Sequence, residues 1–238
     1  MSLKQDLQLL QLMRLVSPAL PVGAFAYSQG LEGAIEQSWV SKEAQAKDWI
    51  SGVLQQNLAS LDLPALYWQL QTLNDDNISE FLELNDLVFA MRETSELRLE
   101  SAQMGAALLK LLRDTAENLE GLCHQVIHET QFNTLDKPLD WVSAFALAAK
   151  TVNLTANQAL LGYGWAWCET QVAAAIKLVP LGQTQGQTML NQLITEIANL
   201  NDVLLQKMPD IDNLGAISPN LAIISSQHEQ QYSRLFRS

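Results

Sequence analysis

Residues 41–58 read SKEAQAKDWISGVLQQNL, and this stretch decides the class of fold. Its apolar residues recur every three or four positions, which places them on one face of an α-helix: Ala46, Trp49, Ile50, Val53, Leu54 and Leu58. Ser41 is a suitable N-cap, and Glu43 with Lys47 forms a favourably oriented i,i+4 pair. The stretch therefore predicts an amphipathic helix.

The same periodicity extends over most of the chain. It predicts further helices at 3–16, 24–37, 64–73, 79–92, 95–113, 138–152, 156–178 and 186–207. No run of alternating β-branched residues and no Asn-Gly or Asp-Gly hairpin turn interrupts this pattern. We expect an all-α fold, a single-domain bundle of about eight to ten helices joined by loops that contain Pro and Gly. Residues 1–238 form that domain, and residues 219–238 are expected to be a C-terminal tail ordered on partner binding.

Composition and net charge limit the classes of partner that the chain is expected to bind. The chain has 238 residues, 48% of them hydrophobic and 17% charged, with a net charge of -12. Such a composition excludes a disordered protein, and the negative charge disfavours nucleic acid and anionic membrane surfaces as partners. The first residues lack the layout of a signal peptide and no stretch is typical of a membrane span, so we expect a cytoplasmic protein.

Motifs for common enzyme chemistries are missing. No Gly-Lys-Ser/Thr sequence occurs, so the chain has no P-loop. His-Glu pairs occur at 128–129 and 228–229, but the positions that would hold the second zinc-binding histidine are Phe132 and Tyr232. We predict a protein without catalytic residues and without a tightly bound metal or cofactor.

Two alternatives remain open at this stage. His124 and His128 are i,i+4 neighbours close to Cys123 and could share a divalent ion in a helical metal-binding module, although a polar helix edge explains them more simply. Ser28, within Ala26-Tyr27-Ser28-Gln29-Gly30, imitates the nucleophile turn of serine hydrolases, but the strand that such a turn needs is not predicted.

Two further features suggest contacts rather than chemistry. Lys177 ends a predicted helix after three consecutive alanines; it either complements the helix dipole or places a cation at a partner surface. Residues 227–238, QHEQQYSRLFRS, carry two Arg, a Tyr and a Phe at the end of an acidic chain. These residue types are enriched in interface cores, so the segment either docks on its own domain or binds a partner.

Four blocks together resemble the UreF family of urease accessory proteins. The first is SPALPVGAFAYSQGLE at 17–32, and the second combines ELR at 96–98 with QMG at 103–105. The third is AAAIKLVPLGQ at 173–183, and the fourth is the ending from His228-Glu229 to RLFRS at 234–238. The stretch from Gln131 to Trp141 is less similar to the family pattern.

The resemblance implies a non-catalytic, dimeric scaffold that helps to install nickel in urease. It implies a bridge between a UreD-type subunit, which contacts apo-urease, and a UreG-type GTPase that carries nickel. Nickel would transit the complex, and GTP hydrolysis in the partner would release it toward urease. An arginine finger, Arg234 or Arg237, would be the physical means if the protein activated that GTPase.

The resemblance also implies roles for individual residues. The GTPase-facing surface, or the tail that forms it, would comprise His228, Glu229, Tyr232, Arg234, Leu235, Phe236, Arg237 and Ser238. Lys177 would gate the nickel route or contact a partner. The dimer contact or the contact with the UreD-type subunit would come from Pro18, Pro21, Gly23, Tyr27, Ser28, Gln29, Gly30 and Glu32.

Overall fold

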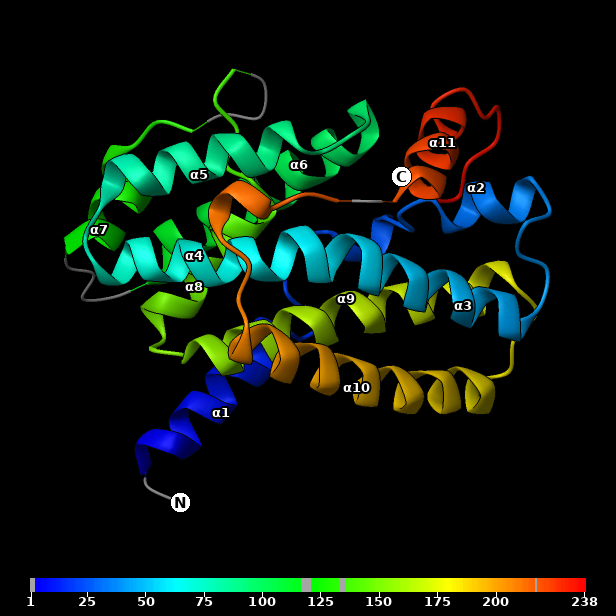
Figure 1. The fold of residues 1–238 in the computed structure, drawn as a ribbon, viewed down its shortest axis with the longest axis horizontal. Helices are drawn as coiled ribbons and strands as arrows, with labels where there is room; N and C mark the ends of the chain where they lie inside the picture. Colours follow the sequence, from blue (N-terminus) through cyan, green and yellow to red (C-terminus); the bar gives the residue numbers. More distant parts are fainter. Residues whose placement is uncertain (1–2, 117–120, 133–135, 217) are drawn as a thin grey trace.

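Helices make up every regular element in the part of the chain that the structure describes. The computed structural model describes residues 3–116, 121–132, 136–216 and 218–238 (Figure 1). The elements are α1 (Leu3–Leu15), η1 (Ala24–Ala26), α2 (Leu31–Glu36), α3 (Glu43–Val53), η2 (Leu54–Asp62), α4 (Leu63–Asn74), α5 (Ile78–Ala90), α6 (Ser95–Thr115), α7 (Gly121–His124), η3 (Gln125–Glu129), α8 (Trp141–Thr151), α9 (Ala156–Leu178), α10 (Gln183–Gln206), η4 (Ile211–Asn213) and α11 (Pro219–His228). The all-α prediction is confirmed.

Elements α3, η2 and α4 follow one another without a break and form a long rod (Figure 1). The sequence predicted two separate helices here, because Pro64 normally marks a boundary. Proline has no N–H to donate within a helix; close to it, the carbonyl of Ser60 accepts a bond of 3.2 Å from the N–H of Gly215. The wider π-helical turns of η2 immediately precede this proline, and the chain stays helical through it.

Helix α8 lies at the centre of one half of the molecule, against α4 and α6. Its residues from Val142 to Ala149 are all buried, which its nearly continuous apolar sequence requires. The predicted start at Pro138 is three residues early, because Asp140 is the N-cap and accepts a 2.8 Å bond from the N–H of Val142. Gly105 of α6 touches this turn: a Cβ there would lie 2.0 Å from the carbonyl oxygen of Leu139.

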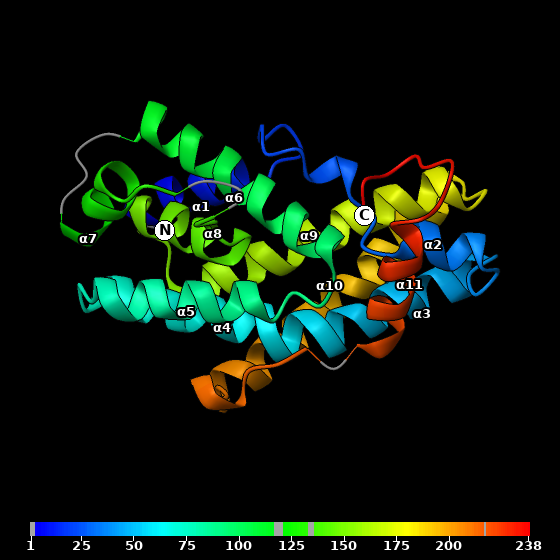
Figure 2. The same ribbon diagram turned by 90° about the horizontal axis from the view of Figure 1, so that it is seen from above.

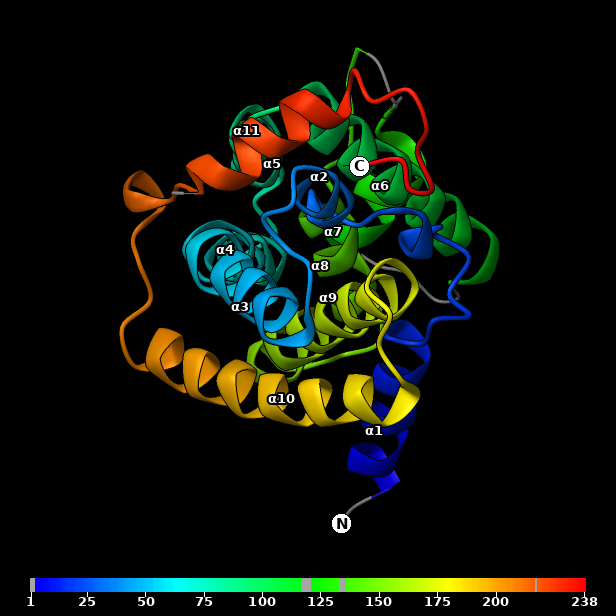
Figure 3. The same cartoon turned by 90° about the vertical axis from the view of Figure 1, so that its right-hand side faces the viewer.

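Helices α9 and α10 form an antiparallel pair along the opposite side (Figures 1 and 3). A capping box of Thr155 and Gln158 starts α9. The two helices approach closely at glycines, because a Cβ on Gly186 would lie 2.4 Å from the side chain of Ile176. Small residues therefore set the distance between these two helices.

The helix predicted at 24–37 is interrupted. Only η1 and α2 are helical, and the residues between them include Gln29 and Gly30 with φ values of 45° and 77°. Left-handed backbone breaks a right-handed helix, and glycine adopts it without a steric cost. The space at Gly30 is also taken, since a Cβ there would lie 2.9 Å from the side chain of Leu221 in α11.

Helix α11 was not predicted, because residues 219–238 were treated as a tail. Pro219 occupies the first turn, where a missing N–H costs nothing, and the helix crosses α2 and α6 (Figure 3). The buried face includes Leu221, Ile224 and Ser225. Contacts within the single chain thus hold the whole segment in place; ordering on partner binding stays a prediction.

The buried hydrophobic side chains form one connected cluster that extends from Leu15 in α1 to Phe236 near the C-terminus. Figure 2 shows the C-terminus beside α2, at the end of the molecule where α11 lies. Among the described residues, no helix combines the length and apolar character needed to cross a membrane.

Candidate functional site

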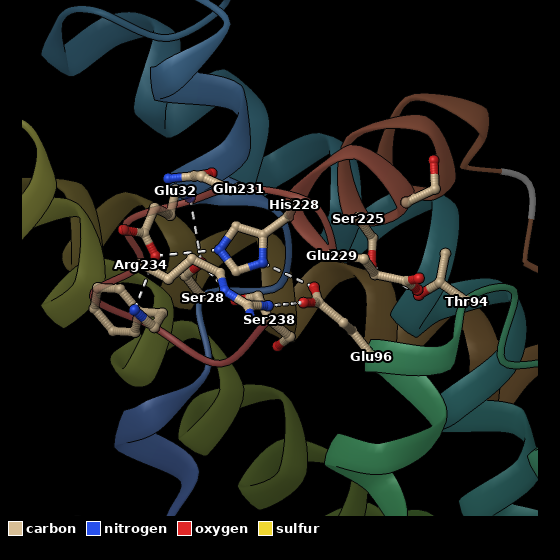
Figure 4. Close-up of polar contacts among 12 residues, drawn as sticks. Ser28, Glu32, Thr94, Glu96, Ser225, His228, Glu229, Gln231, Arg234 and Ser238 are labelled. Carbon is tan, nitrogen blue, oxygen red and sulfur yellow. Dashed lines mark hydrogen bonds and ion pairs between the residues drawn. The ribbon is translucent and has the colours of Figure 1, made fainter.

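Segments far apart in the sequence meet around the last eleven residues. We define the C-terminal clasp as residues 228–238 together with Ser28, Glu32, Glu96 and Glu100, which hold them (Figure 4). These residues come from three of the four sequence blocks described above: 17–32, 96–105 and 228–238. Lys177 adds the remaining block, 173–183, through its contact with Phe236, described below. The clasp is therefore the point at which all four blocks converge.

His228 occupies the centre of the clasp. It is the last residue of α11 and its ring is fully buried. Nδ1 lies 2.8 Å from a carboxylate oxygen of Glu96, and Nε2 lies 3.3 Å from one of Glu32 (Figure 4). The ring thus ties the end of α11 to the first turns of both α2 and α6.

The same two carboxylates bind the segment that follows α11. Glu32 accepts the backbone N–H groups of Leu235 and Phe236 at 2.7 and 2.8 Å. Glu96 accepts a 2.7 Å bond from the guanidinium of Arg234. Each glutamate therefore joins His228 to the last residues of the chain, and charge-assisted bonds of this kind are the stronger ones.

Ser238 is buried at the far end of the clasp. Its carbonyl accepts bonds from both the N–H and the hydroxyl of Ser28, at 2.8 and 2.7 Å, and its own hydroxyl donates to Glu100 at 2.6 Å. Burial raises the pKa of Glu100 to about 7, although the bonds from Ser238 and Gln29 oppose the shift. Chain ends need such ties to be ordered.

This geometry leaves the hydrolase alternative without a usable nucleophile. Ser28 is fully buried, and its hydroxyl donates to a backbone carbonyl. His228 uses both ring nitrogens on carboxylates, so it does not face Ser28 as a general base. Both residues have structural partners instead.

Lys177 contacts the clasp from α9. Its ammonium group lies 5.7 Å from the ring centroid of Phe236, a cation–π distance. It also lines a cavity of about 200 Å³ together with Tyr27, Gln29 and residues of α1 and α9. Gln29 accepts a 2.6 Å bond from the indole of Trp167 and donates one to Glu100.

The predicted GTPase-binding residues divide into two groups. His228, Phe236 and Ser238 are buried, so they order the segment rather than offer a contact surface. Tyr232 is fully exposed and Leu235 is 67% exposed. An open groove beside α6 is lined by the remaining members, Glu229, Arg234 and Arg237, together with Glu96 and Gln103.

The first block divides similarly. Tyr27, Ser28, Gly30 and Glu32 are buried in or beside the clasp, and Gln29 is half-buried. Outside it, Pro18 and Pro21 are exposed and Gly23 is half-buried, whereas Phe25 is 68% exposed. The block therefore joins the clasp to an exposed loop, and its role in dimerisation or in binding a UreD-type subunit stays a prediction.

His124 and His128 lie at another end of the molecule, on α7 and η3. Their rings are 5.1 Å apart and both residues are exposed, while Cys123 is buried. Burial raises the pKa of the Cys123 thiol. Within the described residues, no group of three or more His, Cys, Asp or Glu side chains is arranged to hold a metal ion.

Sequence reasoning missed the two acidic partners on α6. Glu96 and Glu100 are separated by one helical turn, with Gln103 a further turn along, on a face that is otherwise buried. A polar stripe at i, i+4 and i+7 along an apolar face was the available signal.

A second buried charge cluster, which we call the core cluster, was also missed. Arg92 binds Asp62 at 2.7 Å and Asp140 with two bonds of 3.1 Å, and Tyr163 donates to Asp62 at 2.7 Å. Ser101 donates to Asp140 at 2.7 Å. The two aspartates raise the pKa of Arg92 well above its usual range despite its burial, so the guanidinium stays charged. This cluster joins η2, α6 and the start of α8.

Fold and site together define an all-helical protein whose acidic, basic and hydroxyl side chains at the site are engaged in holding its own chain end. Comparison with known proteins identifies the class. The family model for UreF matches residues 40–194. The urease accessory protein UreF of Marinomonas sp. is 45% identical over 233 residues, covering 98% of this chain and 95% of the relative. Those of Marinobacter nauticus and Teredinibacter turnerae are 44% and 42% identical over 98% and 97% of this chain, and over 95% and 99% of their own lengths. The chain belongs to the UreF family of urease accessory proteins.

Proposed function

We propose that this protein is a non-catalytic adaptor in urease maturation. In this role it bridges a UreD-type accessory subunit and a UreG-type GTPase, so that GTP-dependent nickel insertion into apo-urease occurs within one complex. Nickel is cargo that passes through the complex. We further propose that it acts as a homodimer.

One observation carries this proposal: the four family blocks converge on the clasp, and the clasp presents exposed apolar side chains. Leu235 projects from backbone that its own N–H and that of Phe236 hold on Glu32. Tyr232 lies between Gln231, whose N–H bonds the carbonyl of His228, and Arg234, which bonds Glu96. Tyrosine in a fixed position is a residue type enriched at binding hot spots, because little conformational entropy is lost when it docks. The polar groups His228, Glu32 and Glu96 are all engaged in bonds that hold the last residues of the chain.

Truncation after Gln227 tests the proposal. The truncated chain should lose capture of the GTPase in a pull-down that includes the UreD-type subunit, while its far-UV circular dichroism stays helical. A sharper variant, Tyr232→Ala with Leu235→Ala, should weaken capture by at least about tenfold, as expected for hot-spot residues. It leaves the bonds of the clasp in place, because both side chains are exposed.

Val203→Ala is the matched control, since Val203 is an apolar residue of α10 that is 62% exposed and lies outside the clasp. It should capture the GTPase as well as the unmodified protein does. Undiminished capture by both the truncated chain and the double variant would show that the GTPase binds elsewhere.

A further inference from the structure

The exposed side chains of His124 and His128 form a pair on α7 and η3, at the end of the molecule opposite α11 (Figures 1 and 2). The centroids of their rings are 5.1 Å apart. The sequence contains one further histidine, His228, which is buried in the clasp. Both exposed histidines of the chain therefore stand side by side.

The backbone that carries this pair is anchored in the core of the molecule. Val126 and Ile127, which lie between the two histidines, are both fully buried. The guanidinium of Arg113 in α6 donates a 2.6 Å bond to the carbonyl of Ile127. The N–H of Thr130 closes the π-helical turn with a 3.0 Å bond to the carbonyl of Gln125, and turns of this kind are frequent at functional sites. The backbone is therefore held in place, while the two rings are exposed.

The spacing of the rings fits two imidazoles on one metal ion. A histidine nitrogen lies about 2.0–2.1 Å from a bound zinc ion, which places the centroid of its ring roughly 3.2 Å from the metal. Two such ligands that subtend about 90–109° at the metal have ring centroids roughly 4.5–5.2 Å apart. The observed 5.1 Å lies within this range. Exposed side chains change rotamer within nanoseconds, so one nitrogen of each ring can turn toward a common ion without movement of the backbone.

The chemistry of imidazole selects the class of cation. Imidazole nitrogen binds Ni²⁺, Cu²⁺ and Zn²⁺, whereas Mg²⁺ and Ca²⁺ prefer oxygen ligands. Two histidines four residues apart on one helix face are a known zinc-binding spacing. The net charge of -12 also favours the approach of cations over that of anions.

We propose that His124 and His128 together bind one Ni²⁺ or a similar divalent transition-metal ion, with water molecules completing its coordination. Two protein ligands make this site weak and exchangeable, in contrast to a structural metal site with four. Binding is a property of the isolated chain. The use of the site for nickel cargo in urease maturation rests on the proposed function.

Isothermal titration of the full chain with Ni²⁺ alone tests the site. The protein is prepared without a polyhistidine tag, and the titration is made at about pH 8 because metal ions bind deprotonated imidazole. One equivalent of Ni²⁺ should bind in the presence of a large excess of Mg²⁺, which does not compete for nitrogen ligands. In the same assay, affinity should rise from Co²⁺ through Ni²⁺ to Cu²⁺.

Single substitutions assign the binding to the pair. His124→Gln and His128→Gln should each weaken Ni²⁺ binding at least about tenfold, because even loss of a group that orients a metal ligand costs about 10–100-fold in affinity. Both side chains are exposed, so the variants should keep the circular dichroism spectrum of the unmodified protein. Gln125→Ala, at an exposed position between the two histidines, is the matched control and should bind Ni²⁺ as the unmodified protein does.

Three results would overturn the site: Ni²⁺ affinity unchanged in either histidine variant, complete displacement of Ni²⁺ by Mg²⁺, or an affinity that does not increase from Co²⁺ to Cu²⁺. The second result would show that surface carboxylates bind the ion. The titrations need neither the GTPase nor the UreD-type subunit. Their failure would therefore leave the adaptor function standing, and undiminished GTPase capture by the truncated chain and the double variant would leave the metal site standing.

Discussion

The core cluster and the C-terminal clasp each join two buried carboxylates through one nitrogen-bearing side chain. In the core cluster, Arg92 neutralises Asp62 and Asp140; in the clasp, His228 lies between Glu32 and Glu96. Both sets are buried, and in both one side chain joins two carboxylates from different elements. Arginine stays protonated in proteins and offers five N–H donors, whereas histidine offers its two ring nitrogens. The molecule therefore places a permanently charged side chain between the helices of the core, and a ring that bonds through both nitrogens between α2, α6 and the last residues of the chain.

Replacement of Arg92 should lower the free energy of unfolding more than any substitution in the clasp. Arg92→Met leaves Asp62 and Asp140 buried without their cation, which costs about 3–5 kcal/mol of the free energy of unfolding. Urea denaturation at pH 7 measures it. Lys110→Met removes an exposed cation of α6 and should change the same quantity by less than about 0.5 kcal/mol. Equal, small effects of both changes would mean that the core cluster contributes no more than surface charge.

The substitution Glu100→Gln should remove one contribution to the pH dependence of the free energy of unfolding. The folded-state pKa of Glu100 is raised from 4.5 to about 7, so the stability that its neutral form provides is complete below about pH 4.5 and is lost as the pH rises through about 7. Relative to the unmodified protein, the glutamine variant should gain up to about 3 kcal/mol in free energy of unfolding between pH 4.5 and 8.

Denaturant titrations at several pH values check this expectation. Glu83→Gln, at an exposed site on α5, is the control and should follow the curve of the unmodified protein. A parallel curve for Glu100→Gln would show that the buried carboxyl does not titrate in this interval.

His228→Ala should have a smaller effect on stability than Arg92→Met, although the ring is fully buried. The two glutamates keep other donors, because Glu32 retains two backbone N–H groups and Glu96 retains Arg234. We expect a loss of about 1–2 kcal/mol in the free energy of unfolding, measured by urea denaturation at pH 7. Gln227→Ala, at the exposed neighbouring position, should be neutral. A loss as large as that of Arg92→Met would contradict the comparison.

The sequence predicts the regular helices well and the clasp poorly, for identifiable reasons. Apolar periodicity is local information, and it locates α5, α6 and α9 to within a few residues. It fails at Gln29 and Gly30, where left-handed backbone interrupts the pattern. It also fails near Pro64, where the carbonyl of Ser60 accepts a bond from Gly215, 155 positions away, and the helix continues.

The clasp depends on pairings that no local pattern encodes. His228 meets a glutamate 132 positions away and another 196 positions away. The family resemblance marked the blocks that meet there, but it did not indicate which side chains turn inward. Helix α11 escaped prediction for a related reason: its buried face includes Ser225 and His228, whose hydroxyl and ring are satisfied by Thr94 and the glutamates. A sequence pattern assigns polar residues of this kind to the solvent-exposed face, because it does not show their buried partners.

Gly105 has a consequence for how this chain tolerates change. Its hydrogen atom occupies the space where any other residue would place a carbon against the Leu139 carbonyl, next to the aspartate that both caps α8 and binds Arg92. A single added methyl group would therefore displace both the start of α8 and the ion pair between Asp140 and Arg92. Side chains on exposed faces extend into water and are tolerated, whereas a side chain at Gly105 would clash with the backbone of Leu139.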